Sequence, residues 1–161
     1  MEKPNLQLNI SRRKMLFQIL RVASSKLIKG EYRFPAVSEI TAEDLRDRMK
    51  AEQPPLLIDV RPAPEFNAGF GHISNSKLIP MMELVGSFTD FNDFKKKVKG
   101  IETQFNEIFP LREKEVITIC PGGGFSLVAA EIMAEAGFTD VKSLSAGIDG
   151  WFKKGYPTTL S

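Results

Sequence analysis

The sequence predicts an α/β domain with a central, mostly parallel β-sheet flanked by helices. Short and nearly continuous apolar runs at 56–60 and 116–120 are typical of strands that helices cover on both faces. Segments with helical spacing alternate with these runs along the chain, as expected for a parallel sheet. A chain of 161 residues is also long enough to bury the core of one such domain.

Residues 1–39 are predicted to form a basic N-terminal helical arm, and residues 40–161 the domain. Residues 1–33 hold eight lysines and arginines against two acidic residues, whereas the rest of the chain has an excess of acids. Apolar residues recur at helical spacing from Leu16 to Leu27. Two interpretations are open: the helix packs on the domain with its charges in solvent, or its basic face contacts an anionic membrane surface or an acidic partner.

The remaining elements follow in chain order. Thr41 is a predicted N-cap for a helix over 41–51, and strands are predicted at 56–60 and at 77–80, where Pro80 ends the second. A phenylalanine-rich amphipathic helix is predicted over 91–108, bent or interrupted at Gly100, with its apolar stripe on the sheet or on a partner. After the strand at 116–120, the pattern predicts a helix over 125–136 closed by Gly137, a strand at 141–144 and a helix at 148–154.

The amino-acid composition excludes some kinds of site and favours one cellular compartment. The single cysteine excludes an internal disulfide and a multi-cysteine metal cluster, and we expect neither a metal nor a nucleic acid as a partner. The low cysteine content favours the cytoplasm. Ser11-Arg12-Arg13 is similar to a twin-arginine export signal, which leaves export open, although the apolar run after it is short and broken by charges. No run approaches the ~20 apolar residues that a membrane-spanning helix needs.

The one cysteine stands where parallel sheets form their sites. Cys120 ends a predicted strand, and Gly122, Gly123 and Gly124 lead from it into the next helix. The glycines can take positive φ, which would let their N–H groups turn toward one point, and we expect the helix N-terminus to add further unpaired N–H groups. Such a loop would favour the thiolate, which is the nucleophilic form. The sequence therefore predicts that Cys120 is a reactive thiol.

Other uses of a glycine-rich loop do not fit the residues. The loop lacks the Gly-Lys-Ser/Thr ending of a nucleoside-triphosphate site and the G-x-G-x-x-G spacing of a dinucleotide site. A Cys–His catalytic pair would require His72, the only histidine. Its place between Gly71 and Ile73 is more typical of a residue that stabilises a turn.

Four motifs, in one order, resemble those of the rhodanese family and span about three quarters of the chain. In chain order they are Ile58-Asp59-Val60-Arg61 with Glu65-Phe66; Gly71-His72-Ile73 with Ile79-Pro80; Cys120 to Ser126, which matches C-x-x-G-x-x-S; and Ser145-Ala146-Gly147-Ile148-Asp149-Gly150-Trp151 with Gly155-Tyr156-Pro157. The resemblance implies one rhodanese-like domain of three layers, with the sheet between two layers of helices. It leaves residues 1–39 unexplained.

The resemblance also implies sulfurtransfer through a persulfide on Cys120. The thiolate would take the outer sulfur of a donor such as thiosulfate, a polysulfide or a thiol persulfide, and pass it to a thiol, to cyanide or to a protein acceptor. No cofactor is implied beyond this covalent persulfide. Asp59 and Arg61 would support the site as an ion pair, and Trp151 would lie in the core. The persulfide-binding loop would consist of Pro121, Gly122, Gly123, Gly124, Phe125 and Ser126.

The loop departs from the family pattern at two positions. Members that use thiosulfate well often carry Arg or Lys in the loop, where this chain has Pro121 and Phe125. Backbone dipoles alone would then attract an anion, and Pro121 removes one N–H from the loop. A persulfide or protein donor is therefore favoured over thiosulfate, and Phe125→Arg is expected to improve thiosulfate use.

Three alternatives stand beside the enzyme. One is a persulfide-carrying or redox-sensing module with little turnover of small molecules, and another is a docking domain without catalysis. The third, a phosphatase or arsenate reductase of related fold, would need an arginine where Ser126 stands.

Overall fold

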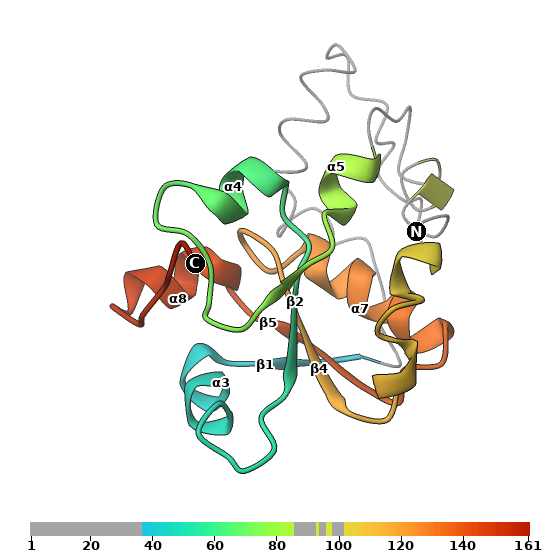
Figure 1. Ribbon diagram of the computed structural model, residues 1–161, viewed down its shortest axis with the longest axis horizontal. Coiled ribbons are helices and arrows are strands. Elements are labelled where there is room, and N and C mark those ends of the chain that lie inside the picture. Colours follow the sequence, from blue (N-terminus) through green and yellow to red (C-terminus); the bar gives the residue numbers. More distant parts are fainter. Residues whose placement is uncertain (1–36, 86–92, 94–95, 98–101) are drawn as a thin grey trace, which may run out of the picture.

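The computed structural model describes residues 37–85, 93, 96–97 and 102–161, and it shows an α/β fold (Figure 1). Five parallel strands form one sheet in the order β1-β5-β4-β2-β3. They are β1 Ser38–Ile40, β2 Leu56–Asp59, β3 Lys77–Leu78, β4 Glu115–Ile119 and β5 Asp140–Leu144. The predicted fold class is confirmed, and in the described residues the sheet is parallel throughout.

Helices cover the two faces of the sheet, which gives the three layers expected (Figure 1). Leu45 of one helix and Trp151 of another lie in the apolar core on one face, whereas Phe105 and Val128 lie in the core on the other. The helices are α3 Ala42–Arg48, α4 Ala63–Asn67, α5 Met81–Val85, α7 Phe125–Glu135 and α8 Gly147–Lys153, with short 3-10 helices η2 Glu102–Phe105 and η3 Phe109–Leu111.

Side chains of the central strand β4 point alternately into these two cores. Ile117 and Ile119 pack in the core with α3 and α8, whereas Cys120, directly after the strand, packs in the core with α7. Thr118 is fully buried, and its Oγ1 donates a hydrogen bond of 2.7 Å to the carbonyl of Ser126 in the first turn of α7. The strand therefore presents Cys120 on the face that α7 covers.

Most predicted helices and strands are found close to their expected ends. Thr41 is the N-cap of α3, because its Oγ1 accepts the Asp44 N–H at 3.1 Å. Gly137 follows the end of α7 with φ of +110°, as expected of a residue that closes a helix.

The strand β1 was not predicted. Its first two residues lie in the segment assigned to the arm, and it pairs with β5 from Ser38 to Ile40. Three residues are too few for a sequence period to be visible, and the partner strand lies far along the chain. The sheet therefore starts before residue 40, while the rest of the predicted arm, residues 1–36, lies outside the described residues.

The predicted helix over 91–108 is only partly described, because most of residues 91–101 lie outside the described ranges. The prediction is wrong for the last part of this helix, because Glu102–Phe105 forms the 3-10 helix η2 rather than an α-helix. Pro110 has no N–H for the Asn106 carbonyl, which prevents an α-helix from continuing past this point but does not account for the 3-10 geometry of Glu102–Phe105. Phe105 and Ile108 are nevertheless buried in the core with α7, as the predicted apolar stripe requires.

Candidate active site

Cys120 lies at the carboxyl end of β4, enclosed by the loop that leads into α7. Its side chain has no exposed surface. The Sγ atom accepts the Gly123 N–H at 3.0 Å and lies 3.2 Å from the Ser126 Oγ, to which the thiol donates. The loop therefore aims one backbone donor and one hydroxyl at the sulfur.

Two opposing influences act on the proton of this thiol. Burial, the larger one, raises the pKa of Cys120 above its usual value. Hydrogen bonds from Ser126, Gly123 and Gly122 act to lower the pKa. The sequence predicted donors that favour the thiolate, and the structure has those donors, but the loss of water around the sulfur outweighs them. The resting cysteine thus holds its proton more tightly than a cysteine in water.

The three loop glycines differ in their conformations. Gly123 has φ of +90°, and a Cβ there would lie 2.8 Å from the backbone nitrogen of Ala146. Gly124 has φ of −86° and serves as the N-cap of α7, and Gly122 is not among the residues with positive φ. Positive φ, which a glycine can adopt at each of these positions, is therefore found at one of the three. Only Gly123 needs it, because it packs against the turn after β5.

The start of α8 holds the cysteine loop from the other side. The Ile148 N–H donates to the Cys120 carbonyl at 2.9 Å, and the Asp149 N–H donates to the Pro121 carbonyl at 3.1 Å. The first N–H groups of α8 thus find their partners in the cysteine loop. Gly147, with φ of +61°, permits this approach, because a Cβ there would overlap both carbonyl oxygens.

A line of buried hydroxyl groups lies behind the sulfur. The Ser126 Oγ lies 2.7 Å from the Ser143 Oγ, and both serines are fully buried. Ser143 in β5 is the register partner of Thr118 in β4. Sequence reasoning named Ser126 but missed Ser143 and Thr118. A polar residue inside the apolar run of β4 is the signal that could have found Thr118. The strand β5 also contains Asp140 and Lys142, so Ser143 gives no such signal.

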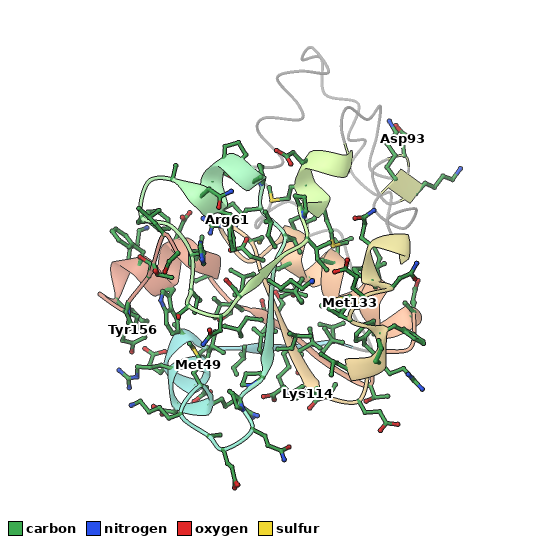
Figure 2. The ribbon with its side chains drawn as sticks, viewed as in Figure 1. Met49, Arg61, Asp93, Lys114, Met133 and Tyr156 are labelled. Atoms are coloured by element: carbon green, nitrogen blue, oxygen red, sulfur yellow. The ribbon has the colours of Figure 1, made fainter. Side chains whose placement is uncertain are left out.

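Asp59 and Arg61 form a buried ion pair at the end of β2. The Arg61 Nη2 lies 2.8 Å from the Asp59 Oδ2, and the Arg61 Nε donates to Oδ1 at 3.0 Å. Arg61 Nη2 also donates to the Gly71 carbonyl at 2.9 Å, which fixes the loop after α4. The charge of Arg61 is therefore largely balanced within the protein. Figure 2 shows this side chain beneath α4.

A pocket of about 400 Å³ adjoins the cysteine loop at Pro121. Cys120, the residue before Pro121, does not line this pocket. Among the lining residues are the apolar side chains of Phe70, Pro121 and Ile148 and the charged side chains of Arg61, Glu65 and Asp149. Burial raises the pKa of Asp149, whereas Lys153 and Arg61 act to lower it. The pocket combines an apolar wall with more acidic than basic groups.

Phe125 does not face this pocket. It is the first residue of α7, and its side chain is fully buried in the core on that face. Cys120 lies in the same buried cluster as Phe125, and the place of Phe125 in the persulfide-binding loop stays a prediction.

Phe125→Arg is accordingly expected to destabilise the protein rather than to improve thiosulfate use. Removing a large aromatic side chain from a core costs about 3–5 kcal/mol, and burying a charge adds to this. Urea unfolding of this variant and of Phe152→Arg, where Phe152 is 49% exposed, provides the measurement and its control. A stable Phe125→Arg protein with faster thiosulfate turnover would restore the sequence-based expectation.

His72 and Trp151 have structural contacts. The His72 ring stacks on Phe66 with 3.6 Å between ring centroids, and its Nδ1 lies 2.8 Å from the Phe66 carbonyl. The backbone of His72 exchanges two hydrogen bonds with Thr159. Trp151 is buried and donates its Nε1–H to the Pro157 carbonyl at 2.9 Å. These contacts fit the predicted turn-stabilising histidine and core tryptophan.

Metal binding and membrane insertion receive no support from the part of the chain that the structure describes. There, no group of three or more His, Cys, Asp or Glu side chains is placed to hold a metal ion. No helix among the same residues is long and apolar enough to cross a bilayer.

Comparison with known families decides the relationship. The model of the rhodanese-like domain matches residues 41–154, which includes every helix and strand from α3 to α8. The chain belongs to the rhodanese-like family. The matched region contains the cysteine loop, the Asp59–Arg61 pair and the start of α8, whereas β1 lies just before it.

Relatives of this rhodanese-like domain are of two sizes. It is 33% identical over 102 residues to thiosulfate sulfurtransferase 16, chloroplastic, of Arabidopsis thaliana, which covers 63% of this chain and 77% of that protein. It is 27% identical over 117 residues to the adenylyltransferase and sulfurtransferase MOCS3-1 of Zea mays, covering 73% of this chain. The match spans only 22% of the MOCS3-1 protein, so the likeness concerns one part of a longer chain.

A solved structure shows the same fold. The crystal structure of a rhodanese-related protein from Thermoplasma volcanium matches with a TM-score of 0.54 and 27% sequence identity. The match covers 77% of this chain and 99% of that one. Nearly the whole of that protein therefore corresponds to the rhodanese-like domain described here.

Proposed function

We propose that this rhodanese-like domain is a sulfurtransferase that carries a sulfane sulfur as a persulfide on Cys120. The observation that carries the proposal is the surroundings of the sulfur, where the Gly123 N–H donates to Sγ at 3.0 Å and the Ser126 Oγ, 3.2 Å away, can donate once the thiol has lost its proton. Preorganised donors of this kind stabilise an anion that forms during reaction. The names of the Arabidopsis and Zea mays relatives, both of which include the word sulfurtransferase, support the same type of reaction.

The reaction has two steps, with Cys120 as the covalent carrier. The Cys120 thiol first gives up its proton, and the thiolate attacks the outer sulfur of the donor. A new S–S bond forms at Cys120 while the S–S bond of the donor breaks, and the donor leaves as a thiolate or as sulfite. A thiol or cyanide then attacks the outer sulfur on Cys120, which releases the cysteine thiolate. Because one S–S bond replaces another in the loading step, no external oxidant or reductant is needed.

The pocket supports an organic persulfide as the donor rather than thiosulfate. Asp59 balances the positive charge of Arg61, and Glu65 and Asp149 add negative charge at the same pocket. A dianion such as thiosulfate would be repelled there, whereas the apolar wall formed by Phe70, Pro121 and Ile148 suits a carbon skeleton. A cavity of about 400 Å³ falls in the range of small organic ligands. Since Cys120 is fully buried and does not line the pocket, we infer that the loop shifts as the donor's sulfur reaches Cys120.

Mass spectrometry of the intact chain tests this function. After exposure to polysulfide or to a thiol persulfide, the protein is expected to gain the mass of one sulfur atom on the peptide that contains Cys120. Cyanide or dithiothreitol should remove this sulfur. An unchanged mass with polysulfide, thiol persulfide and thiosulfate alike would overturn both the enzyme and the carrier.

A persulfide carrier with little turnover is the second candidate, and the complete burial of Cys120 favours it. A loaded sulfur enclosed by the loop would leave slowly unless a partner opened the site. Steady-state turnover with a thiol persulfide and a thiol acceptor separates the two. The enzyme predicts repeated cycles, whereas the carrier predicts one loading event for each chain.

Asp149→Asn is expected to raise kcat/KM for thiosulfate about threefold, the change that a modest charge interaction near the surface produces. The substitution removes one negative charge from the pocket while preserving shape, so kcat/KM for a thiol persulfide, whose sulfur carries one negative charge less than thiosulfate, should change less. Added salt should reduce the difference, because it screens exposed charges. Asp47→Asn, on the exposed face of α3, is the control. Equal thiosulfate rates for the three proteins would refute the charge argument.

A further inference from the structure

The hydroxyl groups of Ser126 and Ser143 form a chain that starts at the Cys120 sulfur. The distances are 3.2 Å from Sγ to the Ser126 Oγ and 2.7 Å from that oxygen to the Ser143 Oγ. All three side chains are fully buried. In such surroundings a hydroxyl without a partner is costly, and neighbouring hydrogen bonds strengthen one another. When the sulfur loses its proton and becomes an anion, we therefore expect the hydrogen bonds of all three groups to rearrange together.

The chain of hydroxyls has a different proton arrangement for each state of the sulfur. With a neutral thiol, the S–H donates to the Ser126 Oγ, and the Ser126 hydroxyl is free to donate to Ser143. With an anionic sulfur, the Ser126 hydroxyl turns and donates to Sγ. The Ser126 oxygen then accepts the Ser143 O–H at the same 2.7 Å separation. Either oxygen of the serine pair can be the donor, so no heavy atom has to move.

We propose that Ser143 is a positioning residue that stabilises the anionic Cys120 sulfur through the hydroxyl of Ser126. Its place in the sheet supports this role, because Ser143 lies opposite Thr118, which donates to the Ser126 carbonyl at 2.7 Å. The two strands thus hold Ser126 at its backbone and at its side chain. This role of Ser143 rests on the proposed function only where it concerns the rate of sulfur transfer. The ionisation of the thiol can be measured without any sulfur transfer.

Substitutions at Ser143 and Ser126 leave the charged side chains near the loop unchanged, which matters for testing this role. Arg61 and its partner Asp59 lie at the end of β2, and Glu65 and Asp149 line the pocket together with Arg61 and Pro121. The hydroxyl that the variants remove is uncharged. A change in the titration of Cys120 can therefore be assigned to the loss of hydrogen bonds rather than to the loss of a charge.

Ser143→Thr and Ser143→Val are the decisive pair, because they have the same shape and differ in one hydroxyl. The readout is the ultraviolet absorbance of the thiolate as a function of pH, with the Cys120→Ser protein subtracted. Cys120 is the only cysteine of the chain, so the difference reports on one group. Ser143→Val is expected to have about threefold less thiolate than Ser143→Thr at a given pH below the midpoint, as the loss of one modest hydrogen bond predicts. Identical titrations of two folded variants would overturn the proposal.

A Ser126→Ala background tests whether Ser143 acts through Ser126. Without the Ser126 hydroxyl, the Thr and Val variants at position 143 should titrate alike. A difference that persists in this background would refute the connection. Ser145→Ala, a serine substitution just beyond β5, should leave the titration unchanged.

The thiolate titration also separates this inference from the proposed function. If the chain gains no sulfur but the Thr and Val variants differ, sulfurtransfer fails and the role of Ser143 stands. If the chain gains sulfur but the Thr and Val variants titrate alike, sulfurtransfer stands and the role of Ser143 fails.

Discussion

Cys120→Ser is expected to abolish sulfur loading completely while leaving the fold intact. A serine hydroxyl does not attack sulfane sulfur at neutral pH, and no other thiol exists among the 161 residues to replace Cys120. The fold should survive, because the smaller hydroxyl occupies a site where the Gly123 N–H and the Ser126 Oγ are available as partners. Intact mass after polysulfide exposure and a thermal unfolding curve measure the two effects.

Ser126→Ala is the matched control for Cys120→Ser. It retains the thiol and removes only a hydroxyl that contacts the sulfur, so it should load sulfur more slowly but to the same final extent. Sulfur gained by the Cys120→Ser protein, held at any residue, would place the chemistry elsewhere and remove Cys120 from the mechanism.

Gly147→Ala is expected to disrupt the cysteine loop and to lower stability markedly. A left-handed backbone costs a residue with a side chain about 1–2 kcal/mol. The added Cβ would also overlap the carbonyl oxygens of Cys120 and Pro121. These carbonyls cannot retreat without losing their hydrogen bonds to the Ile148 and Asp149 N–H groups. Urea unfolding should show a loss larger than the backbone strain alone, and sulfur loading should slow at least tenfold, because the loop no longer holds its donors around the sulfur.

Gly155→Ala separates backbone strain from overlap. Gly155 has a similar φ of +74°, but a Cβ there would meet no atom within 4 Å. This variant should lose only the strain contribution, and it should load sulfur at the normal rate. Equal losses of stability for the two variants would show that the overlap at position 147 adds nothing to the backbone strain.

The larger elements of the fold could be predicted because they carry a local pattern. A few consecutive residues are enough to recognise the apolar runs of β2 and β4, the cap at Thr41 and the glycine after α7. The three-residue strand β1 does not, since its place in the sheet depends on pairing with β5. The last part of the helix predicted over 91–108 was wrong, because Glu102–Phe105 forms a 3-10 helix, although Phe105 and Ile108 keep the buried positions that the apolar spacing indicates.

At the candidate site, the sequence located the thiol but not its surroundings. The position of Cys120 follows from the end of a strand and the glycines after it. Which glycine takes positive φ depends on how closely the turn after β5 approaches, and this approach is a tertiary contact. The burial of Phe125 depends in the same way on how α7 packs on the sheet. The partners of Ser126 come from β4 and β5, which only the strand register brings together.

The enclosure of Cys120 also bears on oxidative damage. Peroxides oxidise cysteines that are exposed and readily ionised. The resting sulfur has no exposed surface, and burial raises the pKa of its thiol, so both determinants of susceptibility are unfavourable to oxidants. This chain has no second cysteine that could rescue a sulfenic acid by forming a disulfide. The closed loop therefore provides the chemical protection that other redox-exposed proteins obtain from a resolving thiol.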